Sequence, residues 1–445
     1  MKKIITVIYT LSFVIGAVSA QSVYDGVKIA DKDLNGTARF VGMGGAMGAL
    51  GGDITTMGTN PAGIGIYRSN DVMTSFSYSA YGMESKYEGQ KSTIDKNRWS
   101  FDNIGVVFAT KIGNQTPLRY VNFGFNYKRS KSFYKNMSMS GMMGVVENPS
   151  NPGSPYYVSQ TNSMALQATD AERYVWDNSR QHLDFDNANR IFSDPDAGWL
   201  GALGYQGGLT ERDRIDNEPD LYVPFLPVEP SSVFNSREKG GIDQYDFNVS
   251  FNINDRVYLG LTIGAYDVDY DKYSGYDESY KRGEGYSLES YNNISGSGFD
   301  VKMGLILRPF EYSPFRIGFA VHTPTFYKLT YSTSAIVTND YRDAKTDELK
   351  RIIVDTYDYV GDMKRDYRLV TPWKYNVSLG YTVGTSLALG AEYEYEDYST
   401  MKFKYSSNDG GGDMEFENAE VKNCLKGEHT FRIGAEYKVI PEFAF

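Results

Sequence analysis

The sequence predicts an all-β fold, a transmembrane antiparallel β-barrel, from three observations. The chain begins with an export signal, its later segments alternate apolar and polar residues, and its connections are alternately long and short. The 445 residues include 37 Tyr, 24 Phe and 45 Gly at a mean hydropathy of −0.44, and beyond residue 20 no apolar run is long enough for a transmembrane helix. This composition is typical of strands that face lipid on one side and a wet lumen on the other.

Residues 1–20 have the pattern of a secretory signal peptide. Two lysines precede an apolar run from Ile4 to Val18, and Ser19-Ala20 follows. The run is too short to span a membrane as a helix, so we expect cleavage near Ala20 and a mature chain outside the cytoplasm.

The rest of the composition argues against several classes of function. The net charge of −11 is spread along the chain, whereas nucleic-acid binding requires clustered Lys and Arg, so we expect no nucleic-acid partner. Cys424 is the only cysteine, and His182, His322 and His429 are widely separated, which argues against a disulfide and a Cys/His metal site. No nucleophile elbow, zinc-protease or P-loop motif occurs. We expect no cofactor, no metal and no enzymatic activity.

The most specific stretch is the glycine-rich segment 38–66, which precedes the first strand. It holds nine glycines in 29 residues, and residues 60–63 (Asn-Pro-Ala-Gly) have the composition of a turn. The run 42–47 lacks the last glycine of a dinucleotide-binding motif, follows no strand and opens no βαβ unit, which argues against a nucleotide site. We expect an ordered segment packed in a confined interior.

Two adjoining segments show the strand pattern most clearly. Apolar residues occupy alternate positions from 245 to 253 with polar residues between them, and apolar residues again recur at alternate positions from 257 to 265. One face therefore suits lipid and the other suits water. Asn254-Asp255 predicts a two-residue hairpin turn between them. Further segments with this pattern are 121–127, 299–307, 375–381, 387–395 and 431–437.

The connections between strands alternate in length when the first strand is placed at about 71–82. Short periplasmic turns and longer external loops are typical of transmembrane barrels. The alternation requires Pro324 and Pro372 to lie within or beside kinked strands, as proline does at bulges and strand ends. Short links are expected near 112–118, 254–255, 310–314, 383–385 and 439–441, and long links near 83–98, 133–241, 270–298, 339–365 and 407–427.

The longest connection, 133–241, exceeds an ordinary loop. Within it we expect Asp170 to cap a short amphipathic helix that runs toward Phe192. Trp176, Phe185 and Phe192 would then form an external apolar patch for a ligand. The alternative is that these side chains pack on one another within the loop.

Two sets of carboxylates occupy alternate positions. The aspartates at 267, 269 and 271 suit a solvated strand end near the external rim, or a weak divalent-cation contact to lipopolysaccharide. The glutamates at 392, 394 and 396 share one face, and we expect them to pair in the lumen with Lys302, Arg432 or Lys438. Such pairs brace a barrel interior.

The strand count from these patterns is ten, with the beginning of an eleventh at 442–445. Single-chain bacterial barrels have even strand numbers, and closure requires that the last strand pairs with the first. Pro441 leaves no full amphipathic final strand, so we expect the chain to be C-terminally incomplete.

Several motifs resemble one outer-membrane family. Arg39, the run 42–46 (Gly-Met-Gly-Gly-Ala), Asp53 and the run 60–64 (Asn-Pro-Ala-Gly-Ile) resemble the N-terminal plug of the FadL-type transporters, which carry long-chain fatty acids and aromatic hydrocarbons.

Later segments extend the resemblance. Residues 317–325 and 371–374 are similar to strands of that family. Thr56 and Gly65 depart from its pattern, since alanines are usual at both positions, and the 133–241 connection is longer than the family leads us to expect.

The resemblance implies a 14-stranded barrel with a plug, or hatch, inside its lumen, of which this chain would lack three to four strands. Residues 21–70 would form the hatch, and 71–445 the outer-membrane barrel. The hatch positions expected to gate or bind ligand are Gly44, Gly45, Asn60, Pro61, Ala62 and Gly63. Asn60 and Pro61 are expected to fix its resting position.

The implied function is passive transport of hydrophobic small molecules, such as long-chain fatty acids, across the outer membrane of a Gram-negative-type bacterium. The ligand would be captured externally and released sideways into the membrane at a kinked strand, after a small displacement of the hatch. The expected partners are the ligand, outer-membrane lipid and lipopolysaccharide, and the barrel-assembly machinery, with the protein a monomer.

Two alternatives stay open. A surface receptor for haemin or another nutrient, or an adhesin-like protein, would use the barrel only to display the 133–241 connection. A barrel-embedded lipid hydrolase would need a Ser/His pair and is the least favoured.

Overall fold

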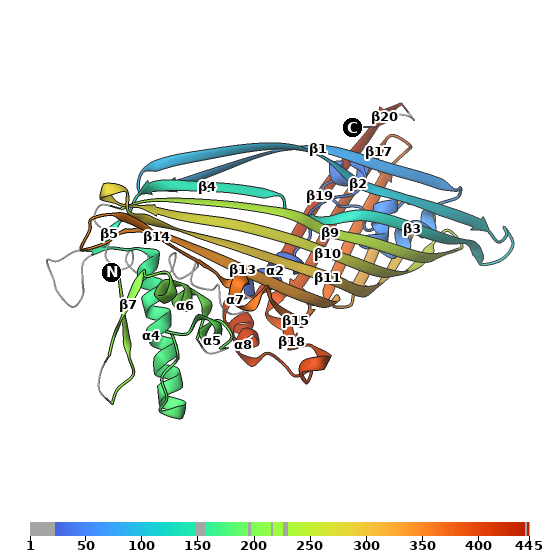
Figure 1. Ribbon diagram of the computed structural model, residues 1–445. Coiled ribbons are helices and arrows are strands. Elements are labelled where there is room, and N and C mark those ends of the chain that lie inside the picture. Colours follow the sequence, from blue (N-terminus) through green and yellow to red (C-terminus); the bar gives the residue numbers. More distant parts are fainter. Residues whose placement is uncertain are drawn as a thin grey trace.

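The computed structural model describes residues 23–146, 156–194, 197–214, 217–225, 230–440 and 443–444, so the predicted signal peptide lies outside the described residues. Sixteen strands form one strongly curled antiparallel sheet (Figure 1). No described helix is long and apolar enough to cross a membrane. The predicted all-β fold is confirmed.

The main path of the sheet runs through eleven strands, each of which pairs with the next. They are β1 (Asp71–Tyr87), β2 (Gln90–Lys111), β3 (Leu118–Ser132), β9 (Ser231–Ile253), β10 (Val257–Ser279), β11 (Gly285–Leu307), β12 (Arg316–His322), β16 (Lys374–Val383), β17 (Leu387–Asp397), β19 (Gly427–Ile440) and β20 (Phe443–Ala444). Five more pair beside this path, namely β4 (Lys135–Met142), β13 (Phe326–Arg342), β14 (Leu349–Asp355), β15 (Met363–Val370) and β18 (Lys402–Tyr405). Within the described residues, β1 and β20 are the two edges of the path.

Three of the long wall strands are each built from two pieces. β12 continues into β13 across Pro324, β15 into β16 across Pro372, and β17 into β18 across the short helix η4 (Tyr398–Thr400). Proline lacks the N–H that a ladder needs, so it lies where the ladder is interrupted. The prediction that Pro324 and Pro372 lie at kinks of continuous strands is confirmed.

The outer face carries an apolar band of defined height. On β10 the outward positions are apolar from Val257 to Ala265, and the next ones are Asp267, Asp269 and Asp271. On β9 the inward residues between 244 and 252 are polar and buried. A band of nine residues agrees with the roughly 9–11 residues that a tilted strand needs to cross a bilayer. The predicted alternation is confirmed.

The turn between β9 and β10 has the predicted chemistry. Asn254 and Asp255 have φ of 53° and 57°, and Arg256 N donates to Ile253 O at 3.0 Å. Two successive residues with positive φ are what a type I′ hairpin turn requires, and Asn and Asp tolerate that conformation best after glycine.

The predicted long links 83–98, 133–241, 270–298 and 339–365 are wrong in extent, since strand residues occupy their ends. β1 and β2 run on to a turn at Glu88-Gly89, and β10 and β11 are joined only by residues 280–284. Beyond the apolar band of β10 the outward residues are polar, as at Asp267 and Asp269, whereas inward residues such as Tyr270 are aromatic, so the alternation that marks a lipid-facing strand is lost there. The sheet therefore projects well beyond the apolar band.

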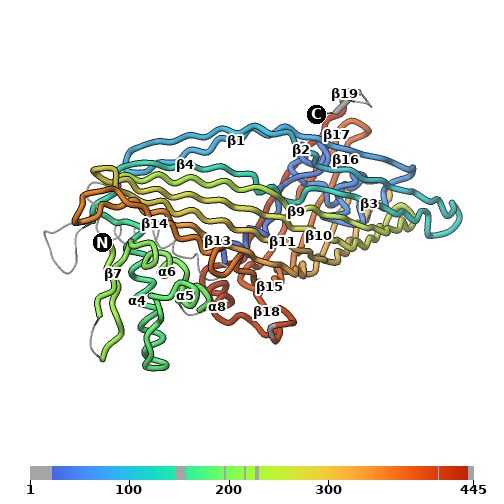
Figure 2. Tube along the Cα trace, in the orientation of Figure 1, coloured from blue at the N-terminus to red at the C-terminus, as the bar shows by residue number. Residues whose placement is uncertain are grey.

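The curl of the sheet encloses the N-terminal segment (Figures 1 and 2). The segment contains α2 (Val23–Ala30), α3 (Ala38–Gly42) and the 3₁₀ helices η1 (Ile54–Gly58) and η2 (Pro61–Ile66). We call residues 38–66 the plug. We call the part of the lumen toward the β1–β2 turn the upper lumen and the part around the plug the lower lumen. In the upper lumen, α2 packs near α8 (Glu415–Cys424) in a cluster of buried aromatic and aliphatic side chains.

The segment between β4 and β9 forms a compact excursion at the end of the sheet that carries the β1–β2 turn (Figure 1). It contains β5 (Val145–Val146), β6 (Tyr156–Tyr157), α4 (Gln160–Ser179), α5 (Ala188–Ile191), α6 (Trp199–Gln206), β7 (Thr210–Asp213) and β8 (Leu221–Pro224). Ser159 caps α4 and not Asp170, which is a mid-helix residue, so that prediction is wrong. Ser159 forms a full capping box with Asn162, a stronger N-terminal signal than an isolated aspartate.

One short helix and two 3₁₀ turns complete the secondary structure of the described residues. These are α7 (Thr356–Val360), between β14 and β15, and the 3₁₀ turns η3 (Lys281–Gly283) and η5 (Ser407–Asp409).

Candidate functional site

The glycine-rich plug is an ordered structure built from two linked turns. Gly44 and Gly45 have φ of 61° and 79°, and their N–H groups donate to Val41 O and Phe40 O, both at 2.9 Å. A left-handed pair of this kind ends helix α3, and glycine adopts it without steric cost.

The second turn is held by Asn60. Its Oδ1 accepts from Ala62 N at 3.2 Å and so caps η2, in which Pro61 takes the first position. Its Nδ2 donates to Gly48 O at 2.8 Å, which joins the two turns. Asn60, Pro61, Ala62 and Gly63 are all buried, so the predicted hatch residues form one packed unit.

The wall binds this second turn directly through polar side chains. Pro61 O accepts from Ser250 Oγ at 2.8 Å and from Asn248 Nδ2 at 3.3 Å, and Ile64 O accepts from Asn122 Nδ2 at 2.7 Å. Because these donors come from β9 and β3, the plug is fixed to the wall by directional contacts.

Wall glycines let the plug backbone approach closely. A Cβ at Gly304 of β11 would clash with Asn60 Oδ1, and one at Gly260 of β10 would clash with the Pro61–Ala62 peptide. On the other side of the lumen, a Cβ at Gly390 of β17 would meet the carbonyl of Ala46. The fit between plug and wall therefore depends on glycine at these wall positions.

Buried ion pairs surround the plug. Lys302 Nζ lies 2.8 Å from Asp300 Oδ1 and 2.9 Å from Asp246 Oδ1, with all three side chains at most 1 % exposed. Arg39 of the plug forms a bidentate pair with Glu436 of β19, with Nη2–Oε2 at 2.8 Å, and also donates to Gly52 O. Charge-assisted bonds of this geometry are strong and directional.

The predicted glutamate set pairs partly as expected. Arg432 Nη1 lies 3.1 Å from Glu392 Oε1, and its Nη2 lies 3.0 Å from Glu394 Oε1. Lys374 binds Glu394 and Glu396, whereas Lys302, expected to serve these glutamates, binds aspartates instead. The sequence therefore predicted the inward face and the partner Arg432, but it did not predict Lys374.

A cavity of about 270 Å³ lies between the plug and this charged wall. Residues 31–35 and Thr59 line it from the N-terminal segment, and Lys128, His322 and Lys374 line it from the wall. Its lining is mostly polar and charged, so it suits water and polar groups far better than an apolar solute.

The upper lumen has the opposite character. Val23 and Ile29 of α2 pack among buried aromatic and aliphatic side chains of the wall, which we call the aromatic cluster: Phe133, Tyr266, Tyr270, Tyr327, Leu329, Tyr331, Tyr367, Leu369, Tyr398, Met401 and Phe403. Lys28 ties α2 to the wall, with its Nζ 2.9 Å from Glu238 Oε2. Large aromatic faces of this kind bind apolar solutes well.

The three strand interruptions lie side by side and form what we call the seam, residues 323–325, 371–373 and 398–401. The regular ladders between the three composite strands are interrupted at the same height and resume on the other side, and inside the seam Thr371 N donates to Thr325 O at 3.1 Å. Thr325 N donates to Thr371 Oγ1 at 2.8 Å across it. The seam lies directly beneath the aromatic cluster, since Tyr398 and Met401 belong to both.

The seam also marks the top of the apolar band. Phe299 and Phe326 on its outer side are in ring contact at 5.4 Å, and Trp373 is half-exposed. Above it, β18 pairs with β15, and residues 412–414 cover its other edge, with Met414 N donating to Phe403 O at 3.1 Å. The wall is therefore covered at this point by a short loop and not by a regular strand.

The predicted external patch does not form as a surface. Phe185 and Phe192 are 0 % and 3 % exposed and pack inside the excursion with Ile191 and Trp199, while Trp176 is only half-buried. The self-packing alternative describes Phe185 and Phe192 correctly, because a longer segment buries a larger share of its own apolar surface.

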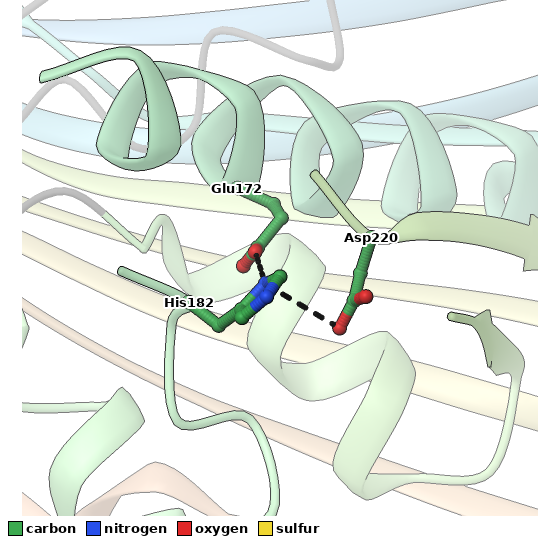
Figure 3. Close-up of side chains that lie close together, drawn as sticks. All are labelled: Glu172, His182 and Asp220. Atoms are coloured by element: carbon green, nitrogen blue, oxygen red, sulfur yellow. Dashed lines mark hydrogen bonds and ion pairs between the residues drawn. The ribbon is translucent and has the colours of Figure 1, made fainter. Parts of the chain in front are cut away.

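The excursion also brings together three side chains that the sequence did not mark (Figure 3). Glu172 on α4, His182 after α4 and Asp220 before β8 place one donor atom each within 4.8 Å of one another. Their spacing in the sequence follows no metal-ligand motif, so only the tertiary fold identifies them.

On the outer face, an apolar groove of about 520 Å³ crosses β16, β17 and β19. Leu379, Leu389 and Ile433 line it, and the wall is thinned there by the inward glycines that contact the plug. It lies within the apolar band, where acyl chains would fill it.

Comparison of the fold with solved structures gives matches at low sequence identity. The toluene transporter TbuX of Ralstonia pickettii matches 92 % of this chain and 84 % of its own, at 12 % identity and a TM-score of 0.37. A FadL homologue of Pseudomonas aeruginosa matches at 92 % and 78 %, 12 % identity and a TM-score of 0.41. The chain is similar in structure to FadL-type channels.

A deletion mutant of the monoaromatic hydrocarbon channel TodX matches 92 % of this chain and 81 % of its own, at 11 % identity and a TM-score of 0.41. At the level of sequence, no family model and no curated protein matches the chain.

Proposed function

We propose that this protein is an outer-membrane channel for the passive transport of hydrophobic small molecules. The supporting observation is the arrangement of the lumen: a plug fixed within a polar, charged lower part, and an aromatic cluster that leads to the seam at the top of the apolar band. An apolar solute partitions into the second environment and is excluded from the first.

The route follows from this arrangement. The solute enters the aromatic cluster from the outer end, moves down to the seam and leaves sideways between the interrupted strands into the bilayer. The plug blocks the axial path and need not move. The substrate classes that we propose are long-chain fatty acids and monoaromatic hydrocarbons, since both are largely apolar and cross a lipopolysaccharide leaflet slowly.

The outer-membrane location is part of the proposal. The band of outward apolar residues has the height of a bilayer core, and its upper edge carries exposed aromatic rings at Phe299, Phe326 and Trp373. Lipid and lipopolysaccharide would surround this band. The barrel-assembly machinery would insert the protein, which would act as a monomer.

Uptake of a labelled long-chain fatty acid and of toluene by cells that express the protein tests the route. Met401→Lys places a charge in the seam at a side chain that is 1 % exposed, and it should lower uptake of both solutes by roughly tenfold or more, which corresponds to about 1.4 kcal/mol. Lys402→Gln, at the exposed neighbouring position, should leave uptake unchanged. Normal uptake by a correctly assembled Met401→Lys variant would refute the proposed route.

A second candidate is a display protein that acts through the excursion. It is favoured by the packed core of the excursion, which includes Phe185 and Leu203 and continues onto Val337 of the wall. Replacing residues 156–225 with a short linker separates the two: a channel keeps part of its flux, whereas a display protein loses all ligand binding.

A further inference from the structure

The excursion holds a compact group of metal-binding side chains. Glu172 points from α4, and Asp220 from the segment before β8, toward the ring of His182 (Figure 3). His182 Nδ1 lies 2.5 Å from Glu172 Oε1 and 3.8 Å from Asp220 Oδ2. One ring nitrogen therefore faces two carboxylates that come from different parts of the chain.

The two carboxylates are buried with little compensating charge. Glu172 is 0 % exposed and accepts one hydrogen bond from Leu183 N at 2.9 Å. Arg212 forms a long ion pair with Asp220, with its Nε 3.8 Å from Asp220 Oδ2, and its Nη2 binds Asp186. A single guanidinium shared among carboxylates leaves the group with net negative charge, which is costly in a buried site unless a cation is present.

Asp220 gives an independent indication. Its side chain is 7 % exposed, is directed at His182, and accepts no side-chain hydrogen bond from the described residues. A buried carboxylate normally accepts several such bonds, so its oxygens are suited to bind something else at this point.

Tyr222 gives a second indication of a ligand at this site. Two residues beyond Asp220, its hydroxyl is buried and has no hydrogen-bond partner within the described chain. A buried hydroxyl next to these carboxylates is a natural partner for a metal-bound water.

We propose that Glu172, His182 and Asp220 bind a divalent transition-metal ion, with Zn²⁺ the best match. One imidazole nitrogen and two carboxylate oxygens form a typical Zn²⁺ donor set, whereas Ca²⁺ and Mg²⁺ bind oxygen ligands and disfavour imidazole. The fourth position opens toward solvent, since the His182 side chain is 43 % exposed.

The two distances from His182 to the carboxylates need only small changes. Tetrahedral Zn²⁺ at about 2.0–2.2 Å from each donor places the donors roughly 3.4 Å apart. The His182–Glu172 pair would open from 2.5 Å, and the His182–Asp220 pair would close from 3.8 Å. Both shifts are smaller than about 1 Å and lie within rotamer adjustment.

The ion would cross-link three segments of the excursion. It would join α4, the connection that follows α4 and the start of β8, in a part of the chain that has no cysteine for a disulfide. Small structures with a limited core often gain stability from a bound metal. The site is independent of the proposed transport route, so a negative result for one does not affect the other.

Trp176 provides a direct readout, because its ring centroid lies 4.7 Å from that of His182. The full chain in detergent is treated with a chelator and titrated with Zn²⁺ and with Co²⁺. We expect one equivalent to bind, with a change in Trp176 fluorescence and, for Co²⁺, the visible absorption of a tetrahedral site. Trp176→Phe should remove most of the fluorescence change and keep the binding.

The ligand variants decide the assignment. Glu172→Gln and Asp220→Asn keep the shape of the site and should each weaken Zn²⁺ binding by roughly tenfold to a hundredfold or more. His429→Gln alters an exposed histidine that contacts Tyr393 far along the chain, and it should leave binding unchanged. Circular dichroism confirms that each variant is folded.

Two results would overturn the proposal. One is the absence of stoichiometric binding of either ion by the folded wild-type chain, which would leave Glu172, His182 and Asp220 as a hydrogen-bonded cluster only. The other is binding that survives both Glu172→Gln and Asp220→Asn.

Discussion

The lower and upper parts of the lumen are filled by opposite chemistry. In the lower part the plug contacts the wall through hydrogen bonds, ion pairs and backbone approach at glycines, as at Ser250, Arg39 and Gly304. In the upper part α2 is packed mainly among apolar and aromatic side chains. Directional contacts hold one arrangement, whereas dispersion contacts can be remade around a solute. Under the proposed function, this difference places closure in the lower part and solute binding in the upper part.

The largest effect is expected from removing the buried cation of the lower lumen. Lys302→Met leaves Asp246 and Asp300 buried without their partner and should lower the free energy of unfolding by about 3–5 kcal/mol. Urea-induced unfolding in detergent measures this change in the free energy of unfolding.

A surface pair supplies the matched control for Lys302→Met. Lys239 lies 3.3 Å from Asp271 with both side chains well exposed, so Lys239→Met should cost less than about 1 kcal/mol. Equal losses for the two variants would contradict the assignment of the lower lumen as a tightly fixed region.

The close contact between plug and wall predicts the next effect. In Gly304→Ala the new methyl group meets Asn60 Oδ1 and Ala62 N, and the strain should cost about 1–3 kcal/mol and raise ion conductance through a displaced plug. Gly113→Ala adds the same methyl group between β2 and β3, where its nearest neighbour is at 3.5 Å, and it should change neither the stability nor the ion conductance. A sealed Gly304→Ala channel of wild-type stability would show that the plug does not rest on this strand.

Asn60→Ala tests the link between the two plug turns. It removes the cap of η2 and the bond to Gly48 O, so a loss of about 0.5–2 kcal/mol and a small rise in the leak of polar solutes are expected. Swelling of proteoliposomes in a sugar solution reports the leak. The prediction fails if Asn60→Ala proteoliposomes swell no faster than wild type.

The smallest effect is expected in the upper lumen. The buried hydroxyl of Tyr367 has no hydrogen-bond partner within the described chain, so Tyr367→Phe should leave stability unchanged within about 1 kcal/mol or raise it slightly. A loss similar to that of Asn60→Ala would mean that the aromatic cluster is held by directional bonds after all.

The sequence predicts the part of the wall that faces lipid, because one apolar face beside one polar face leaves a clear period of two, as on β9 from 245 to 253. It also predicts the turns at Asn254-Asp255 and at residues 60–63, where composition alone selects the backbone conformation. Above the apolar band the outward residues of β10 are polar and the inward ones, such as Val268 and Tyr270, are apolar. The apolar residues therefore change face there, and the upper half of β10 is mistaken for a loop.

Contacts between distant segments produce no such pattern in the sequence. The pairing of Lys302 with Asp246 rather than with a glutamate depends on which strands are neighbours. Likewise Glu172, His182 and Asp220 meet only because α4 and the β7–β8 hairpin pack together. The burial of Phe185 and Phe192 is a further case, since an apolar residue in a loop suits a surface patch and a small core equally well.

The central claim is that apolar solute leaves through the seam while the plug stays in place. A disulfide that joins plug and wall tests it most directly. A Cβ at Gly48 lies 3.1 Å from that of Ser378 on β16, close to the roughly 3.5–4.5 Å that a disulfide spans, so Gly48→Cys with Ser378→Cys in a Cys424→Ala background can lock the plug. Uptake of labelled fatty acid is measured in the oxidised and the reduced protein. Equal uptake in both states is the predicted result. Uptake that stops on oxidation and returns on reduction would show that the plug must move, and would contradict the account.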